Sequence, residues 1–581
     1  MVENPLLELF KLIPASDEGL PTLLIAFDEA AKLYMDGINS RTGSGKELPH
    51  TSIRRMFRSL RRHPMWSVFI STNLRTEMFA PSQIYDSSAR IVSRSLKMEE
   101  LFCSFVLDIE CKARIMQLSE IELNKEITKF ASVDHITMFG RPLWRLYASK
   151  PYNKLRGFVK MKMLGGNALF SASNVYHAFT VVASRVFIDL CVNTVKSVQF
   201  ARETVDNHLR LLIGVDKESG VVETTTPSEP VVADVAATLL VRNDGAKSEM
   251  KTWTACIHPL SEQLFGDGII DKGIKGELFG RLLCILARDQ LPDGISVEED
   301  FRYSHPFKVE IFLNELLGDG TVNGHLNGEI QRRPHGGATK GTLPVWDEKF
   351  DFRRGWCNFN HFTYTTKKLP WDRENLQNVI RRLLRRNAAL QLAPCQSDWD
   401  LLLPVYTGDI DKPIERDHLS AIFVRIGNRQ KPVKLTLGTE YDNFFRPDQL
   451  GFYIQMEFGA GWLSPSTDMR WPSCKRLRGG SFHVSGPFLF GIRVFGADDR
   501  TFPFLAKYPG LGKACGNLVR TLTAKCDYPD EQPVLQALKE FDMEEADAAA
   551  CSSGLGWRGT SGGGGGWQWW GRHSVGVGGG W

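Results

Sequence analysis

Two carboxylates follow directly on an apolar segment near the start of the chain. Leu23–Phe27 is a continuous apolar run, and Asp28 and Glu29 come immediately after it. In nucleotide hydrolysis, an Asp at the end of a strand holds Mg²⁺, and a neighbouring Glu polarises the attacking water. Farther along, Asn73 follows a second apolar run and could sense a γ-phosphate, while Arg90 could neutralise its charge. The pattern predicts nucleotide chemistry with Asp28 as the metal ligand, although strands that end in Asp-Glu also arise by chance.

The phosphate-binding loop that this chemistry needs does not occur before Asp28. A strand that ends in Asp-Glu is the Walker B element of P-loop NTPases, whose phosphate loop, GxxxxGK followed by Ser or Thr, comes earlier in the chain. Thr42–Glu47 imitates that loop, but Ser40 stands where its first glycine belongs, and Glu47 replaces the hydroxyl residue. Either a segment outside this sequence supplies the loop, or the chain does not hydrolyse nucleotide.

A second group of residues has the spacing of a metal-dependent nuclease site. Glu277 opens an expected helix, Asp400 precedes an expected strand, and Arg425 and Gly427 lie two residues apart on the next strand, so they share one face. PD-(D/E)xK nucleases use this layout: the acidic residues bind Mg²⁺ and a Lys orients the attacking water. Arg425 cannot bind a cation, and Gly427 offers no ammonium group. Asp400, as metal ligand, and Glu277 are too few for catalysis, and Asp400 could simply end a loop.

One expected helix carries a basic face. Its apolar positions are Val379, Ile380, Leu383 and Leu384, and its basic positions are Arg381, Arg382, Arg385 and Arg386. Such a face predicts contact with nucleic-acid phosphates near the nuclease-like cleft, and a plain solvated surface is the equal alternative. A second arginine-rich helix is expected within residues 52–62, where we favour a solvated amphipathic face.

The hydrophobic pattern predicts an α/β and α+β chain of several domains. Residues 1–150 read as strand–helix–strand, which indicates a truncated P-loop NTPase-like parallel sheet, covered on both faces and lacking its phosphate loop. Residues 151–250 read as a helical subdomain, with apolar spacing through Ala201–Leu212. Residues 260–545 read as a restriction-endonuclease-like α+β domain. Residues 546–581 are rich in Gly and Trp and are expected to be disordered.

Within the α+β region the pattern is specific enough to place elements. We expect a helix at Lys275–Arg288 and a surface loop at Gly318–Thr342. The strands are expected at Ala389–Leu392, Leu401–Tyr406, Ser420–Ile426, Gly451–Glu457 and Phe488–Val494. In the first region they are expected at Leu23–Phe27 and Ser67–Ser71.

Bulk composition excludes several classes of protein. The 581 residues carry a net charge of +4, so no global basic field points to a nucleic-acid partner. No apolar run is long enough to span a membrane. The 11 cysteines are scattered, which predicts reduced thiols and an intracellular protein, cytoplasmic or nuclear.

Several short segments, taken in order, resemble a known family. They are LLIAFDEAAKL, WSVFISTN, MFGRPLW, NHLRLLIGV, TPSEP, GIKGELFGRLL, FNHF, WDLLLPV and SAIFVRIGNR, and they span roughly residues 20–525. The order is similar to that of fungal Crinkler-type proteins, which fuse a P-loop NTPase to a restriction-endonuclease-like domain. The resemblance implies that Asp28 and Glu29 match Walker B, that Asn73 matches a sensor, and that Glu277 and Asp400 match the nuclease core.

This chain departs from that family in both active sites. The phosphate loop is missing, and Arg425 and Gly427 stand where the family tends to have Gln or Glu and then Lys. The family implies Mg²⁺ and ATP as cofactors, and we expect neither to be retained here. The expectation is an inactive NTPase- and nuclease-like protein that still binds DNA or another protein. The alternative is an ATPase, completed by a preceding segment, coupled to a dead or weak nuclease.

Overall fold

The structure is a computed structural model of the whole chain, which divides into Met1–Thr523 and Ala524–Trp581. It describes residues 3–12, 22–28, 30, 49–60, 62–70, 107–117, 126–215, 222–241, 250–270, 275–291, 301–331, 346–393, 399–428, 431, 444–476, 482–485 and 487–523. The Gly- and Trp-rich tail lies outside these residues. No helix in the described ranges is both long enough and apolar enough to cross a bilayer.

The first described elements form a strand–helix–strand unit, as predicted. α1 (Glu3–Leu12) precedes β1 (Leu23–Phe27), and α3 (Pro49–Ser59) connects β1 to β2 (Met65–Phe69), which pairs with β1 in parallel. β2 begins two residues before its expected start. Phe57 of α3 packs edge-on against Phe27 and Phe69, so α3 covers one face of the strands. On the other face Leu24, Trp66 and Val68 are exposed, so the described residues do not cover both faces as expected.

The predicted helical region also contains one hairpin. Its helices are α8 (Tyr152–Met163), α9 (Val175–Val186), α10 (Val195–Asn207), α11 (Pro230–Val241) and α12 (Lys251–Pro259), and its strands are β3 (Leu211–Val215) and β4 (Val222–Thr225). The expected helix through Leu212 is wrong beyond Asn207, because Leu209 takes a left-handed conformation with φ of 61° and the chain turns into β3. Before these helices lie α5 (Ile109–Gln117), α7 (Val133–Ile136) and short 3-10 turns at Ile127–Ala131 and Pro142–Tyr147.

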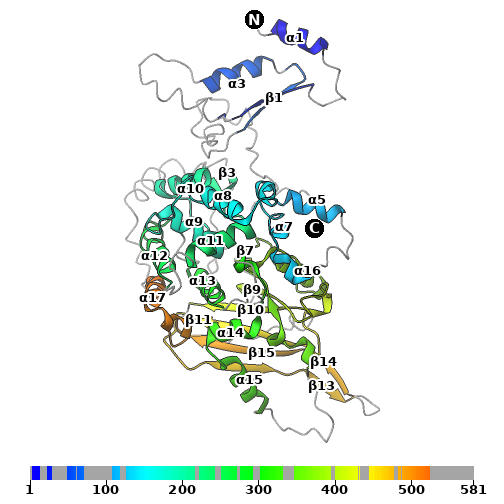
Figure 1. The fold of residues 1–581 in the computed structure, drawn as a ribbon, viewed down its shortest axis with the longest axis vertical. Coiled ribbons are helices and arrows are strands. Elements are labelled where there is room, and N and C mark those ends of the chain that lie inside the picture. The colour runs from blue at the N-terminus through cyan, green and yellow to red at the C-terminus, as the bar shows by residue number, and fades with distance from the viewer. Residues whose placement is uncertain are drawn as a thin grey trace, which may run out of the picture. The chain divides into compact units, whose positions relative to one another are not determined.

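A mixed sheet forms the centre of the α+β region (Figure 1). Its order is β12-β15-β11-β10-β9-β6-β5, with β8 also on β9 and β7 on β8. The bounds are β5 Phe307–Lys308, β6 Trp356–Cys357, β7 His361–Tyr364, β8 Ala388–Gln391, β9 Leu401–Tyr406, β10 Leu419–Gly427, β11 Leu450–Glu457, β12 Ser466–Arg470 and β15 Phe488–Phe495. β13 (Ser473–Arg476) and β14 (Phe482–Ser485) form a separate hairpin. The five strands expected here are confirmed to within one residue at each end.

Helices cover the two faces of this sheet. α13 (Lys275–Asp289), α14 (Val309–Leu317), α15 (Thr321–Gln331) and α17 (Pro509–Thr523) share a core with Ile422, Val424 and Ile454, whereas α16 (Arg373–Arg386) shares a second core with Phe423 and Tyr453. α15 corrects the loop expected at Gly318–Thr342; residues 332–345 lie outside the described part. The first core also includes α8, α9, α11 and α12, so hydrophobic packing runs on from the helical region into the sheet.

Candidate functional site

Pairing of β9 with β10 brings Asp400 next to Arg425. The two strands are antiparallel, and Leu401 pairs with Val424, so the start of β9 lies beside the end of β10. The backbone N–H of Asp400 donates to the Val424 carbonyl at 3.0 Å. The Asp400 Oδ2 accepts from the Ile426 N–H at 2.6 Å and lies 4.0 Å from Arg425 Nε. The β10 backbone thus fixes the Asp400 carboxylate, and the Arg425 guanidinium approaches the same oxygen.

Glu277 reaches the same place from α13. A Cβ at Gly280 would overlap the Ile426 side chain, so glycine lets the helix approach β10 closely. The Glu277 Oε2 accepts from Gln391 Nε2 at 2.8 Å and lies 4.0 Å from Arg281 Nη1. The structure therefore brings together Glu277, Asp400 and Arg425, as the sequence spacing predicts, and adds Gln391 and Arg281.

Burial controls the charge of this cluster. It raises the pKa of Asp400 from 3.8 to about 6, and Glu277 acts in the same direction, while the Ile426 N–H, Arg425 and Arg281 oppose it. Burial lowers the pKa of Arg281 to about 10, so this residue stays charged at neutral pH. Arg281 donates to the Val186 and Phe187 carbonyls at 2.7 and 3.2 Å, which ties it to the end of α9. The negative charges of the two carboxylates and the positive charges of the two guanidinium groups therefore nearly cancel.

Glu457 fills the place of a side chain at position 427. Gly427 and Glu457 pair in the parallel register of β10 and β11, and a Cβ on Gly427 would overlap the Glu457 carboxylate. Glu457 is 3% exposed, accepts from Gln455 Nε2 at 2.5 Å, and lies 3.5 Å from Arg493 Nη2. A side chain at position 427 would therefore require the Glu457 carboxylate to move. Sequence reasoning did not identify Glu457. The one sequence feature that could have indicated it is the spacing of Gln455 and Glu457, which are two residues apart, as Arg425 and Gly427 are.

The cluster does not fit a divalent metal ion. Nowhere in the described ranges do three or more His, Cys, Asp or Glu side chains gather in a way that could hold one. Arg425 approaches the Asp400 oxygen that a cation would need, and a guanidinium repels it. The expected role of Asp400 as a metal ligand therefore has no support in this geometry.

The four arginines of α16 do not form one open basic face. Arg386 forms an ion pair with Asp108, donates to the Ser228 carbonyl at 2.8 Å, and lies over the Phe139 ring at 5.0 Å. Arg385 is half-buried, and burial lowers its pKa to about 10. Arg381 donates to the Asn378 side chain, and Arg382 alone of the four is exposed. Arg386 thus links α16 to two other segments of the protein, and the phosphate-binding role of the four arginines stays a prediction.

Of the nucleotide-site residues, the described ranges contain only Asp28. It follows β1 directly and is exposed, and the next described residue, Ala30, donates its N–H to the Ile70 carbonyl at 2.9 Å. Glu29, Asn73 and Arg90 lie outside the described residues. Their nucleotide roles stay predictions.

Three of the family-like segments meet at one junction. Glu229 of TPSEP accepts from the Arg141 N–H at 2.7 Å and from Trp144 Nε1 at 2.8 Å, both in MFGRPLW. Ser228 Oγ lies 2.7 Å from Nε2 of His361 in FNHF. A Cβ on Gly140 would overlap the Glu229 side chain. Because these three segments contact one another, they have a structural role.

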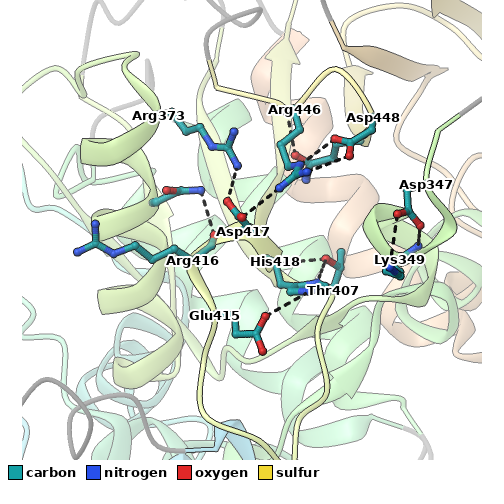
Figure 2. Close-up of polar contacts among 12 residues, drawn as sticks. Asp347, Lys349, Arg373, Thr407, Glu415, Arg416, Asp417, His418, Arg446 and Asp448 are labelled. Atoms are coloured by element: carbon teal, nitrogen blue, oxygen red, sulfur yellow. Dashed lines mark hydrogen bonds and ion pairs between the residues drawn. The ribbon is translucent and has the colours of Figure 1, made fainter. Parts of the chain in front are cut away.

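The opposite end of the β9–β10 hairpin carries a series of ion pairs. Figure 2 shows Asp417 between two arginines, with Arg373 Nη2 at 3.0 Å and Arg446 Nη1 at 3.1 Å. Arg446 also pairs with Asp448 at 2.8 Å, and His418 lies 3.3 Å from the Thr407 hydroxyl. These contacts join α16, the hairpin turn and the segment before β11. They hold the hairpin that carries Asp400 and Arg425 at its other end.

Comparison of the chain with protein-family models, with curated proteins and with solved structures gives no match.

Proposed function

We propose that this protein binds nucleic acid through a restriction-endonuclease-like sheet that does not cleave. The observation that supports this proposal most directly is the position of Arg425, 4.0 Å from Asp400 near the end of β10. A metal-dependent nuclease needs a cation ligand at this position. A guanidinium at that point replaces the charge of a metal ion without its ability to activate water. Binding is thus retained and hydrolysis is lost.

The arrangement of elements supports this proposal. A helix carrying Glu277 is followed by a strand that starts after Asp400 and by an antiparallel second strand that carries Arg425 near its end. This is the order of the nuclease core that the sequence resembles. A side chain at position 427, where the resemblance implies a lysine that orients water, would meet the Glu457 carboxylate. The Crinkler-type resemblance is the second support, and it implies DNA as the polymer.

A binding and cleavage experiment tests the proposal. The full chain is titrated into fluorescently labelled duplex DNA at increasing salt, and the same mixtures are run on denaturing gels with Mg²⁺ or Mn²⁺. We expect binding whose logarithm falls steeply with the logarithm of salt concentration, because phosphate contacts release counterions, and no cleavage. A flat salt response would contradict nucleic-acid binding, and metal-dependent cleavage that Asp400→Asn abolishes would contradict the inactive site.

An ATPase is the second candidate, and one observation favours it. β1 and β2 are parallel, and Asp28 follows β1 at the carboxyl edge, where nucleotide-binding sheets place their Mg²⁺-associated Asp. The phosphate loop would have to come from a segment outside this sequence. A longer chain should then hydrolyse ATP with Mg²⁺ and lose that activity in Glu29→Gln; failure of the longer chain to bind ATP would exclude this function.

A further inference from the structure

We infer that Arg425 binds a backbone phosphate of the nucleic acid directly, in place of a metal ion, so that binding needs no divalent cation. This inference rests on the proposed function and names the residue and the ligand group within it. The ligand is the phosphodiester oxygen pair, which a planar guanidinium contacts through two parallel hydrogen bonds.

Arg425 is the guanidinium of the cluster that a ligand can reach. Its side chain is 35% exposed, whereas that of Arg281 is 1% exposed and that of Arg493 is 17% exposed. Within the part of the chain that the structure describes, its one polar contact is the 4.0 Å approach to Asp400, which is longer than a hydrogen bond. Its N–H donors are therefore available to a ligand, whereas Arg281 donates to carbonyls at the end of α9.

The backbone fixes where this side chain starts. β10 lies between β9 and β11, and Arg425 pairs with Gln455 of β11 in register. The Asp400 carboxylate lies on the Nε side of the guanidinium and is itself held by the Ile426 N–H. Among the described residues no hydrogen bond occupies the terminal Nη1 and Nη2 atoms, which can therefore donate to a phosphate.

The charges around Arg425 explain why a metal ion is not required. Without the Arg425 charge, Asp400 and Glu277 would repel a phosphate, and a divalent cation would be needed to bridge them. With Arg425 present, the cluster is nearly neutral, and this guanidinium is partly exposed. Chelation of metal should leave the affinity of the wild-type protein unchanged.

The test compares Arg425→Gln with the wild type and with Arg354→Gln in the full chain. Arg354 is 63% exposed and pairs with Glu348, so it controls for the loss of one surface charge. Affinity for labelled duplex DNA is measured by anisotropy at several salt concentrations, with EDTA or with Mg²⁺. We expect Arg425→Gln to weaken binding about tenfold or more in EDTA and to reduce the salt slope by about 1, with Arg354→Gln near wild type.

The outcomes separate this inference from the proposed function. If the wild type does not bind DNA, the proposed function fails. If the wild type binds and Arg425→Gln keeps both its affinity and its salt slope, the Arg425 assignment alone fails. Loss of wild-type binding in EDTA also overturns it. Should Arg425→Gln fold poorly by thermal melting, Arg425→Lys keeps the charge but loses the planar fork, and it should bind more weakly than wild type with an unchanged salt slope.

Discussion

Replacement of Asp400 by Asn should stabilise the protein at high pH. Asp400 has a pKa near 6 in the folded chain against an ordinary value of 3.8, and burial is the largest cause. At about 1.4 kcal/mol per pKa unit, that difference amounts to about 3 kcal/mol of folding free energy lost when the carboxyl ionises. The side chain is 20% exposed, so the value is an upper bound. Asn can still accept the Ile426 N–H bond, and it carries no charge to bury.

The sign of the effect follows from proton binding. Between pH 4 and 6 the folded chain holds a proton on Asp400 that the unfolded chain has released, so wild-type stability falls as pH rises through this window. Below about pH 4 both states are protonated, and Asp400→Asn should match the wild type. Above about pH 6 the variant should be more stable, by up to about 3 kcal/mol.

Urea unfolding of both proteins at pH 4.5, 6 and 8 measures this difference. The control is Asp319→Asn, which removes a carboxylate at an exposed turn, and it should change neither the midpoint nor its pH dependence. An Asp400→Asn variant that is less stable than wild type at pH 8, or a stability difference that does not change with pH, would refute the burial argument.

Three further predictions follow from the same contacts. Gly427→Ala should destabilise the chain by about 1–3 kcal/mol in urea unfolding, because its Cβ displaces the Glu457 carboxylate. The destabilisation should be smaller in a chain that also carries Glu457→Ala. Equal destabilisation in the two backgrounds would contradict the overlap. DNA binding should be tighter at pH 5.5 than at 7.5, because protonation of Asp400 removes a negative charge that repels the phosphate beside Arg425, while Glu277, Arg281 and Gln391 stay around it. Asp400→Asn should bind tightly at both pH values, and DNA affinity that falls with acid would contradict this. Gly140→Ala should lower stability by more than Gly166→Ala, since φ is 87° at Gly140 and 85° at Gly166 but only the Gly140 Cβ overlaps Glu229; equal melting temperatures would refute that difference.

The local elements were predictable where the chain is continuously apolar. β9, β10, β11 and β15 are buried on both faces, so their sequences are apolar runs bounded by polar residues, and period two placed Arg425 and Gly427 on one face. The boundary of α10 was missed because Leu211 and Leu212 continue a helical spacing that the turn at Leu209 interrupts.

Contacts between distant segments were not predictable from the pattern. Glu457 lies beside Gly427 only because β10 and β11 pair in one particular parallel register. Arg386 looked like a surface arginine because its partner, Asp108, is 278 residues away in the chain. Spacing within one element reveals which residues share a face, and the register of separate elements decides which of those faces is free to bind.

The most direct test of the account is the affinity of the full chain for duplex DNA in EDTA, measured across salt concentrations for the wild type and Arg425→Gln. The account predicts wild-type binding that survives chelation, falls steeply with salt, and loses affinity together with about one unit of salt slope in the variant. Wild-type binding that disappears in EDTA, or a variant that binds with the wild-type affinity and slope, would contradict it.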